Sequence, residues 1–304
     1  MKKITVKIHL SSKAQIVLAI SSVILLLLLG IGIMVYPMVS SMYMETVRSG
    51  IQTQYQQQMA DSNEDQLSEI REAAKAYNIR LASGELSLLE PTENGYFDQM
   101  LVPGMTDVMA YIHIPKIHVD LPVYHGVGND ALSSGCGHMP QSSLPVGGES
   151  THAVISAHTG MASSSMFSDL PLLVPGDIFQ LDVLGETLTY EIQSEADIQT
   201  VLPVEVRAIQ IKNGEDLCTL VTCVPFGINT HRLLVTGHRI PTPEKAEDQE
   251  DTLTAPPEAN TSVWQDEYWK SIQIGVLLIL VILLIAGTVG AFFYLRKEKG
   301  KYQK

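Results

Sequence analysis

The chain has 304 residues, of which 45% are hydrophobic and 17% charged, and its formal net charge is −13. The length allows one substantial domain with flanking segments, or two small domains. Basic residues cluster at the two ends and leave the middle strongly acidic, which excludes nucleic acid as a partner because phosphate binding needs a patch of Lys and Arg.

The first predicted element is an apolar segment at residues 16–38 that contains no charged residue. It is long enough to cross a hydrocarbon layer of about 30 Å, so we expect a transmembrane helix. The flank at residues 1–15 holds four lysines and no acid, which predicts a cytoplasmic N-terminus. A cleaved signal peptide is the alternative, although the apolar run is long for one.

Residues 39–107 are expected to form a helical segment followed by an irregular stretch. The clearest helix runs from Ser62 to Leu81, where acids precede bases as the helix dipole favours. Its apolar stripe consists of Leu67, Ile70, Ala74 and Tyr77. This stripe indicates a helix that packs on the following domain. Frequent Gly and Pro from residue 82 to 107 predict a loop.

Residues 108–240 consist of short apolar or alternating runs separated by turn residues. The predicted strands are Val108–Ile114, Val119–Tyr124, His152–His158, Ile178–Leu184, Thr187–Ile192, Leu217–Val221 and Leu233–Thr236. So many short strands indicate a mainly β domain, either an antiparallel barrel or a sandwich. A short helix is predicted at Ser163–Asp169.

The chain beyond the predicted barrel contains a linker and a second apolar segment. Residues 241–271 are acidic and contain proline, as in an unpacked tether. Residues 272–295 carry no charge and predict a second transmembrane helix, followed at 296–304 by a basic cytoplasmic tail. Two crossings with both ends inside place residues 40–270 outside the cell.

The three cysteines are Cys136, Cys218 and Cys223, an odd number that leaves at least one thiol without a partner in the same chain. On one strand, Cys218 and Cys223 would lie about 16 Å apart on opposite faces, too far for a disulfide. We interpret Cys136 and Cys218 as packing residues.

Three polar residues stand where predicted strands end or begin. Cys223 lies two residues before Pro225, which ends the strand and leaves the thiol accessible. Arg232 would lie beside Cys223 if their segments form a hairpin, and a guanidinium can stabilise an oxyanion. His158 closes another apolar run, and histidine is the usual partner of a catalytic thiol. Taken singly, each residue also fits a packing or surface role.

The run Thr219-Leu220-Val221-Thr222-Cys223 resembles the Thr-Leu-x-Thr-Cys signature of the sortase family. Four further segments resemble class C, the pilin-polymerising sortases: Tyr111–Ile117, Leu121–Gly126, Leu144–His152 and Phe226–Arg232. The resemblance covers about residues 60–240 and the two-span layout. It implies an eight-stranded sortase-type β-barrel.

The same resemblance implies a cysteine transpeptidase that cleaves a Leu-Pro-x-Thr-Gly-like signal on secreted surface proteins or pilins. Cys223 would form the acyl-enzyme, Arg232 would steady the oxyanion, and His158 would protonate the departing amine. Thr222 and Asn229 are expected to support the site or bind substrate. An amine, in class C typically a pilin lysine, would then take the acyl group. No cofactor or metal is expected, and the location would be the Gram-positive cell surface.

Class C sortases usually carry a lid with an Asp-Pro-aromatic motif before the barrel. Here Glu90, Pro91 and Thr92 stand in that place, so we expect a modified lid in residues 83–95. Three alternatives stay open: a housekeeping sortase that anchors proteins to peptidoglycan, a membrane-tethered protease that uses water, and a non-catalytic assembly module.

Overall fold

The computed structural model describes residues 12–87, 90–100, 108–161, 164–205 and 209–243, together with the single residues 275 and 287. The chain divides into two units, residues 1–40 with 266–304 and residues 41–265. Nearly all of the predicted linker at 241–271, the second apolar segment at 272–295 and the basic tail at 296–304 lie outside the described residues.

In the first unit, the described residues other than 275 and 287 belong to helix α1 (Ser12–Asp61), so the apolar segment at 16–38 is helical. Its large side chains between Ile20 and Val39 are exposed. Within the described ranges, none of the helices has the length of apolar sequence that a bilayer crossing requires. The transmembrane assignment therefore stays a prediction.

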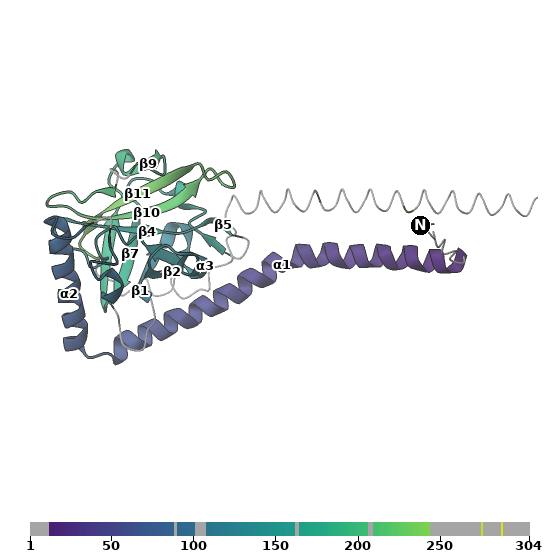
Figure 1. Ribbon diagram of the computed structural model, residues 1–304, viewed down its shortest axis with the longest axis horizontal. Coiled ribbons are helices and arrows are strands. Elements are labelled where there is room, and N and C mark those ends of the chain that lie inside the picture. The colour runs from purple at the N-terminus through teal and green to yellow at the C-terminus, as the bar shows by residue number, and fades with distance from the viewer. Residues whose placement is uncertain are drawn as a thin grey trace, which may run out of the picture. The chain divides into compact units, whose positions relative to one another are not determined.

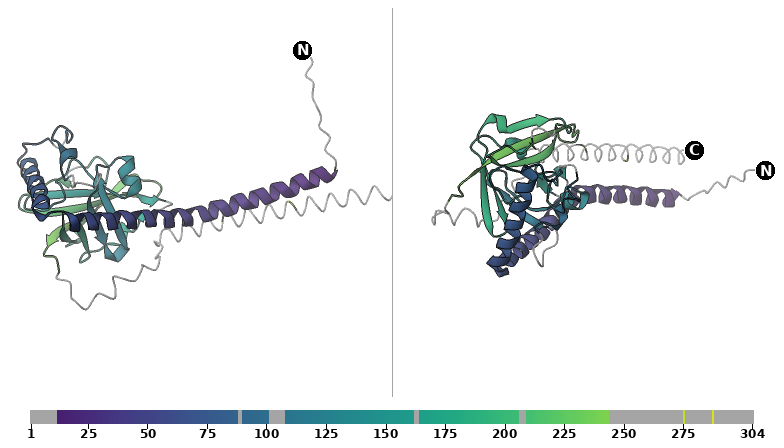
Figure 2. Two further views of the ribbon diagram at one scale, coloured as in Figure 1. Left: turned by 90° about the horizontal axis from the view of Figure 1, so that it is seen from below. Right: turned by 60° about the vertical axis from the view of Figure 1, so that its left-hand side comes forward.

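The second unit begins with the remainder of α1 and continues with α2 (Glu64–Ala82), which starts where the Asn63 side chain accepts a hydrogen bond from the Asp65 amide. The predicted apolar stripe of α2 is buried at Leu67, Ala74 and Tyr77. The amide of Asn78 exchanges two hydrogen bonds with the backbone of Leu144, at 2.9 and 2.7 Å. These contacts hold α2 against the side of the barrel, where the views of Figures 1 and 2 place it.

Eight strands form a closed barrel in the order β10-β4-β3-β2-β1-β7-β8-β11, and pairing of β11 with β10 completes the ring. The strands are β1 (Val108–Ile114), β2 (Val119–His125), β3 (Cys136–His138), β4 (Thr151–Ser156), β7 (Ile178–Val183), β8 (Glu186–Glu191), β10 (Asp216–Val224) and β11 (His231–Ile240). The predicted eight-stranded barrel is thus confirmed.

Smaller elements decorate the barrel. They are α3 (Asn129–Ser134), β9 (Ile198–Val201) on the free edge of β11, the hairpin of β5 (Thr159–Met161) and β6 (Ser164–Met166), and four 3-10 turns at Tyr96–Asp98, Pro115–Ile117, Leu170–Leu172 and Glu195–Asp197. The helix predicted at Ser163–Asp169 is wrong, because residues 164–166 pair with 159–161 as an antiparallel hairpin. The predicted strand His152–His158 ends at Ser156.

Side chains of β4, β10 and β11 alternate between two faces. Those of Cys218, Leu220 and Ile155 join the main core. Those of Val154, Val221 and Leu234 form a separate apolar cluster on the opposite side, which we call the outer face. Val201, Ile209 and Met139 pack on this cluster. The outer face is therefore covered rather than open over its middle.

Candidate active site

Cys223 and Arg232 are direct partners in the antiparallel pairing of β10 with β11. Side chains of directly opposed residues project to the same face, with Cα atoms about 4.5–5.5 Å apart. Cys223 is two residues from Val221, and Arg232 is two residues from Leu234. Alternate residues of a strand share a face, so both belong to the outer face. The hairpin expected from the sequence is therefore present, and it places a guanidinium next to a partly exposed thiol.

His158 lies on the other side of Cys223. Strands β4 and β10 are parallel, with Thr151 opposite Asp216 and Ser156 opposite Val221. The same register continued by two residues brings His158 opposite Cys223, about one inter-strand spacing away. The Ala157 amide, which donates to the Val221 carbonyl at 3.1 Å, shows that the chain keeps this course past the end of β4.

Thr222 fixes both neighbours of His158. Its hydroxyl, on a buried side chain, donates to the Ala157 carbonyl at 2.9 Å and forms a second, short hydrogen bond with the Thr159 hydroxyl. The residue before Cys223 is thereby tied to the residues on either side of His158. These contacts favour a positioning role for Thr222 over contact with substrate.

The Arg232 side chain is oriented by carbonyl groups of its own loop. Its Nη1 donates to the carbonyls of Asn229 and His231, at 3.1 and 3.0 Å. Asn229 has a φ of 58°, in the left-handed region that asparagine tolerates better than most residues. Asn229 thus supports Arg232 through its backbone, which the sequence did not reveal.

The other two thiols are unsuited to chemistry. Cys136 and Cys218 are fully buried, and desolvation raises the pKa of each well above its usual range. Since the thiolate is the nucleophile, both are inert at neutral pH. Of the three cysteines, Cys223 alone is partly exposed.

Exposed apolar side chains border this end of the outer face. Val201, the last residue of β9, pairs with Arg232, and Leu202 and Val204 follow it with exposed side chains. Phe226 and Ile228, from the loop between β10 and β11, are also exposed. An extended peptide with apolar residues would find complementary surface here.

The predicted lid residues Glu90, Pro91 and Thr92 form a turn held by backbone hydrogen bonds from the amides of Asn94 to Tyr96. In the part of the chain that the structure describes, no hydrogen bond or ion pair joins these three residues to Cys223 or its candidate partners. The lid assignment stays a prediction.

Tyr96 is the residue of this region that the sequence did not single out. It is fully buried, and its hydroxyl lies 2.9 Å from Nδ1 of His138 and 3.1 Å from the Gly126 amide, which donates to it. Burial lowers the pKa of His138 to about 4, so the ring is neutral. The sequence did contain one indication of this buried residue, since two aromatic residues follow Gly95 directly within an otherwise polar loop.

A resident metal has no evident place among the residues described, because no cluster of His, Cys, Asp or Glu there has suitable geometry. The chemistry on offer is that of a thiol flanked by an imidazole and a guanidinium, a set suited to acyl transfer.

Comparison with known proteins assigns the chain to a family. Residues 112–240 match the family model for the sortase domain, and the chain is 41% identical to the solved sortase C1 of Streptococcus agalactiae. That alignment covers 63% of this chain and 98% of the other, with a TM-score of 0.58. The chain belongs to the sortase family. Members of this family are cysteine transpeptidases.

Two further relatives are a sortase C and a sortase A. A sortase C of Streptococcus pneumoniae, whose structure informed catalysis and pilin substrate specificity, is 36% identical over 62% of this chain and 96% of its own, with a TM-score of 0.56. Sortase A of Streptococcus agalactiae is 34% identical over 119 residues, 38% of this chain. The match spans about half, 47%, of that curated relative.

Proposed function

We propose that this sortase is a transpeptidase that cleaves a Leu-Pro-x-Thr-Gly-like sorting signal and transfers the acyl group to an amine. The observation that carries the proposal is the register of three neighbouring strands. Cys223 is directly opposite Arg232, and the register of β4 with β10, continued by two residues, aligns it with His158 on the other side. A thiol, an acid–base group and a fixed cation then share one face.

The chemistry follows from these groups. The Cys223 thiolate attacks the threonine carbonyl carbon, and the carbonyl electron pair moves to oxygen, where the Arg232 guanidinium stabilises the negative charge. Collapse of this intermediate breaks the C–N bond, and protonated His158 gives its proton to the departing glycine amine. A thioester remains on Cys223.

An incoming amine completes the transfer. It attacks the thioester carbonyl, its proton passes to His158, and cleavage of the C–S bond regenerates the thiolate. The thioester keeps the acyl group activated, so one amide is exchanged for another without ATP.

The partners we propose are pilins or other secreted surface proteins that bear a sorting signal, with a pilin lysine as acceptor. Support comes from the resemblance to class C segments and from the solved class C relatives. Sortases of Gram-positive bacteria act at the cell surface, and we propose that location here. The exposed apolar side chains of α1 between residues 20 and 39 support attachment to a membrane through this helix.

We also propose that residues 83–95 act as a modified lid, a proposal that rests on the resemblance. Glu90→Ala should then increase the rate at which a small thiol reagent alkylates Cys223. An unchanged rate would remove the support for a lid in which Glu90 takes part.

The proposed function is tested with the full-length protein in detergent and a quenched peptide that contains Leu-Pro-x-Thr-Gly. Mass spectrometry should detect an acyl adduct on Cys223 that is absent from Cys223→Ala. Addition of a lysine peptide should convert the adduct into a product with a new amide. Release of the free acid alone, whatever amine is supplied, would indicate a protease that uses water. Absence of the adduct, also after deletion of residues 83–95, would favour a non-catalytic module.

A further inference from the structure

A polar cluster occupies the outer face at the ends of β4, β10 and β11 away from the candidate active site. Its members on the strands are His152, Thr219, Thr236 and His238. Each is separated by an even number of residues from His158, Cys223 or Arg232 on its own strand, and so projects to the same face. The apolar cluster of Val154, Val221 and Leu234 lies between the two polar ends.

His152 joins the three strands by a chain of hydrogen bonds. Burial lowers its pKa, so the imidazole is neutral and has one donor and one acceptor nitrogen. Nδ1 lies 2.9 Å from the Gln210 carbonyl, which can only accept, so Nδ1 carries the hydrogen. Nε2 then accepts from the Thr219 hydroxyl at 2.6 Å, which in turn accepts from the Thr236 hydroxyl at 2.8 Å.

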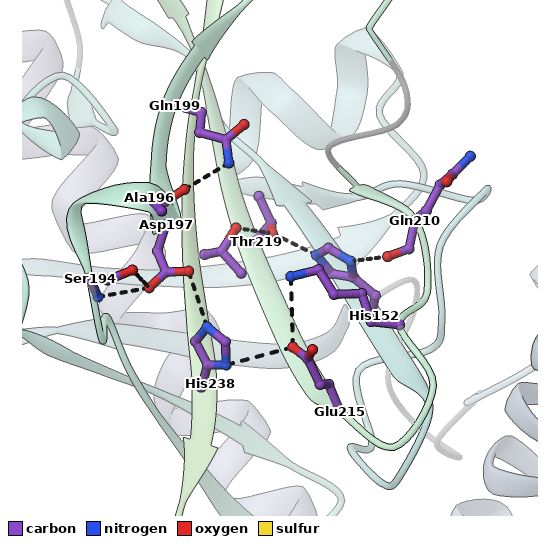
Figure 3. A network of polar contacts seen from close by, with 11 residues as sticks. His152, Ser194, Ala196, Asp197, Gln199, Gln210, Glu215, Thr219 and His238 are labelled. Atoms are coloured by element: carbon purple, nitrogen blue, oxygen red, sulfur yellow. Dashed lines mark hydrogen bonds and ion pairs between the residues drawn. The ribbon is translucent and has the colours of Figure 1, made fainter.

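His238 lies between two carboxylates, as Figure 3 shows. Its Nε2 is 3.1 Å from Oδ1 of Asp197, and its Nδ1 is 3.8 Å from Oε2 of Glu215, which also faces Lys212 at 3.7 Å. Burial opposes ionisation of Asp197, but hydrogen bonds from His238 and Ser194 outweigh it and lower its pKa. Asp197 therefore stays a carboxylate and accepts a charge-assisted hydrogen bond from Nε2 of His238.

All the partners outside the strands belong to one stretch of chain, residues 194–205 and 209–215, which we call the covering segment. Its strand β9 pairs with β11, with Ile198 opposite Val235 and Val201 opposite Arg232. Val201 and Ile209 pack on the apolar cluster. The covering segment is thus held in place by the polar cluster. The last residue of its strand β9 lies beside Arg232.

We propose that the polar cluster positions β9 beside Arg232, as part of the surface that binds the substrate, and that His238 and Asp197 are the positioning residues for substrate binding. The cluster touches none of the reacting groups. Asp197 lies four residues before Val201, a distance of about 13 Å along the strand, so a shift at Asp197 is passed directly to the chain beside Arg232. This inference rests on the proposed function, since the sorting peptide is the substrate that β9 would contact.

The matched control for His238 is His113. It also lies between two carboxylates, with Nδ1 3.2 Å from Asp120 and Nε2 2.9 Å from Asp182, but it is on β1, and these partners are on β2 and β7 rather than on the covering segment. His113→Gln removes a comparable imidazole–carboxylate contact elsewhere on the barrel. A general loss of stability would affect both variants, whereas a positioning effect is confined to His238.

The test compares His238→Gln and Asp197→Asn with wild type and His113→Gln, in the full-length protein. Both cluster variants should raise KM for the sorting peptide about tenfold with kcat little changed, because loss of the hydrogen bond to a charged group lets β9 shift without altering the reacting groups. Amide hydrogen exchange of β9 should become faster, while the alkylation rate of Cys223 should stay at the wild-type value. Asp197→Glu, which keeps the carboxylate, should lie closer to wild type.

Unchanged β9 exchange in both variants would overturn the proposal, as would an equal effect in His113→Gln. A fall in kcat at constant KM would also contradict it, because the cluster would then act on the chemistry. If wild type turns over no peptide, the proposed function fails, but the exchange and alkylation rates still decide whether the cluster holds β9.

Discussion

The two faces of β10 differ in what they contribute to the protein. Cys218, on the inner face, is fully buried in the main core, and desolvation raises the pKa of its thiol. Cys223, five residues later, is on the outer face, partly exposed and opposite Arg232. An odd spacing on a strand reverses the face, so one residue type packs the barrel and also supplies the candidate nucleophile.

The two faces of β10 should differ in whether a substitution affects stability or activity. Inner-face residues of β10 contact the apolar core, where a substitution leaves a cavity. Outer-face residues lie along a line from the polar cluster through Val221 to Cys223. Substitutions on the inner face should therefore lower the free energy of unfolding, and those at the end of the outer face should lower activity.

The largest expected effect is that of Cys223→Ala, which should reduce transpeptidation to background, a loss of at least about 10³-fold, because the nucleophile is removed. Its melting temperature should stay close to that of wild type. Cys218→Ala should do the reverse and lower the free energy of unfolding by about 1 kcal/mol while keeping activity. Turnover of a quenched peptide and thermal melts measure both. A Cys218→Ala variant that is stable but inactive would break the comparison.

Arg232→Ala should lower kcat about 10²-fold, the loss typical of one oxyanion donor. Arg232→Lys keeps the charge but loses the planar fork, and should recover only part of the activity. Arg239 is the control. It is on the same strand as Arg232, and its guanidinium lies over the Tyr190 ring, 5.7 Å from the ring centroid. Arg239→Gln should reduce stability without a comparable fall in kcat. Equal losses of kcat in the two variants would contradict a specific role for Arg232.

Thr222→Val should lower kcat about tenfold, because the Ala157 carbonyl loses its donor and the chain around His158 is no longer held. Thr222→Ser keeps the hydroxyl and should restore most of the rate. Thr189→Val, at another buried threonine with a hydroxyl partner, serves as the control. The pH profile of kcat/KM should change only in Thr222→Val. If Thr222→Ser is as slow as Thr222→Val, the hydroxyl alone does not hold the chain around His158, and the prediction fails.

Local patterns in the sequence predicted most of the barrel. Alternation and turn residues located seven of its eight strands, and the run before Cys223 with the apolar start of β11 predicted the hairpin that pairs Cys223 with Arg232. The three-residue strand β3 was missed because so short a run carries no periodicity. Residues 164–166, which pair with 159–161, fell within the helix predicted at Ser163–Asp169 for the same reason.

The sequence offered the candidate site residues but not the contacts that support them. The tie from Thr222 to Ala157 and the polar cluster around His238 join segments far apart in sequence, and no local pattern reports such contacts. The αL backbone of Asn229 and the buried Tyr96 are likewise decided by tertiary packing. Among nine histidines, composition could not separate the structural ones from His158.

The smallest expected effect concerns two of those structural histidines. The pKa of His113 is raised to about 9: burial opposes its charge, but Asp120 and Asp182 outweigh burial. A raised pKa in the folded state adds stability that is complete below the unfolded value of about 6.5 and is lost as pH rises through 9. His138, with a pKa lowered to about 4, does the opposite and loses stability as pH falls from about 6.5 towards 4.

Urea unfolding of wild type and His113→Gln from pH 6 to pH 10 measures this contribution. The difference in the free energy of unfolding should be on the order of 1 kcal/mol at pH 6, given the exposure of the two carboxylates, and should vanish near pH 10. Repeated with His138→Gln from pH 7 to pH 4, the difference should shrink as pH falls, since the variant has no ring to protonate. Differences that do not vary with pH would mean that packing alone, and not charge, distinguishes the two environments.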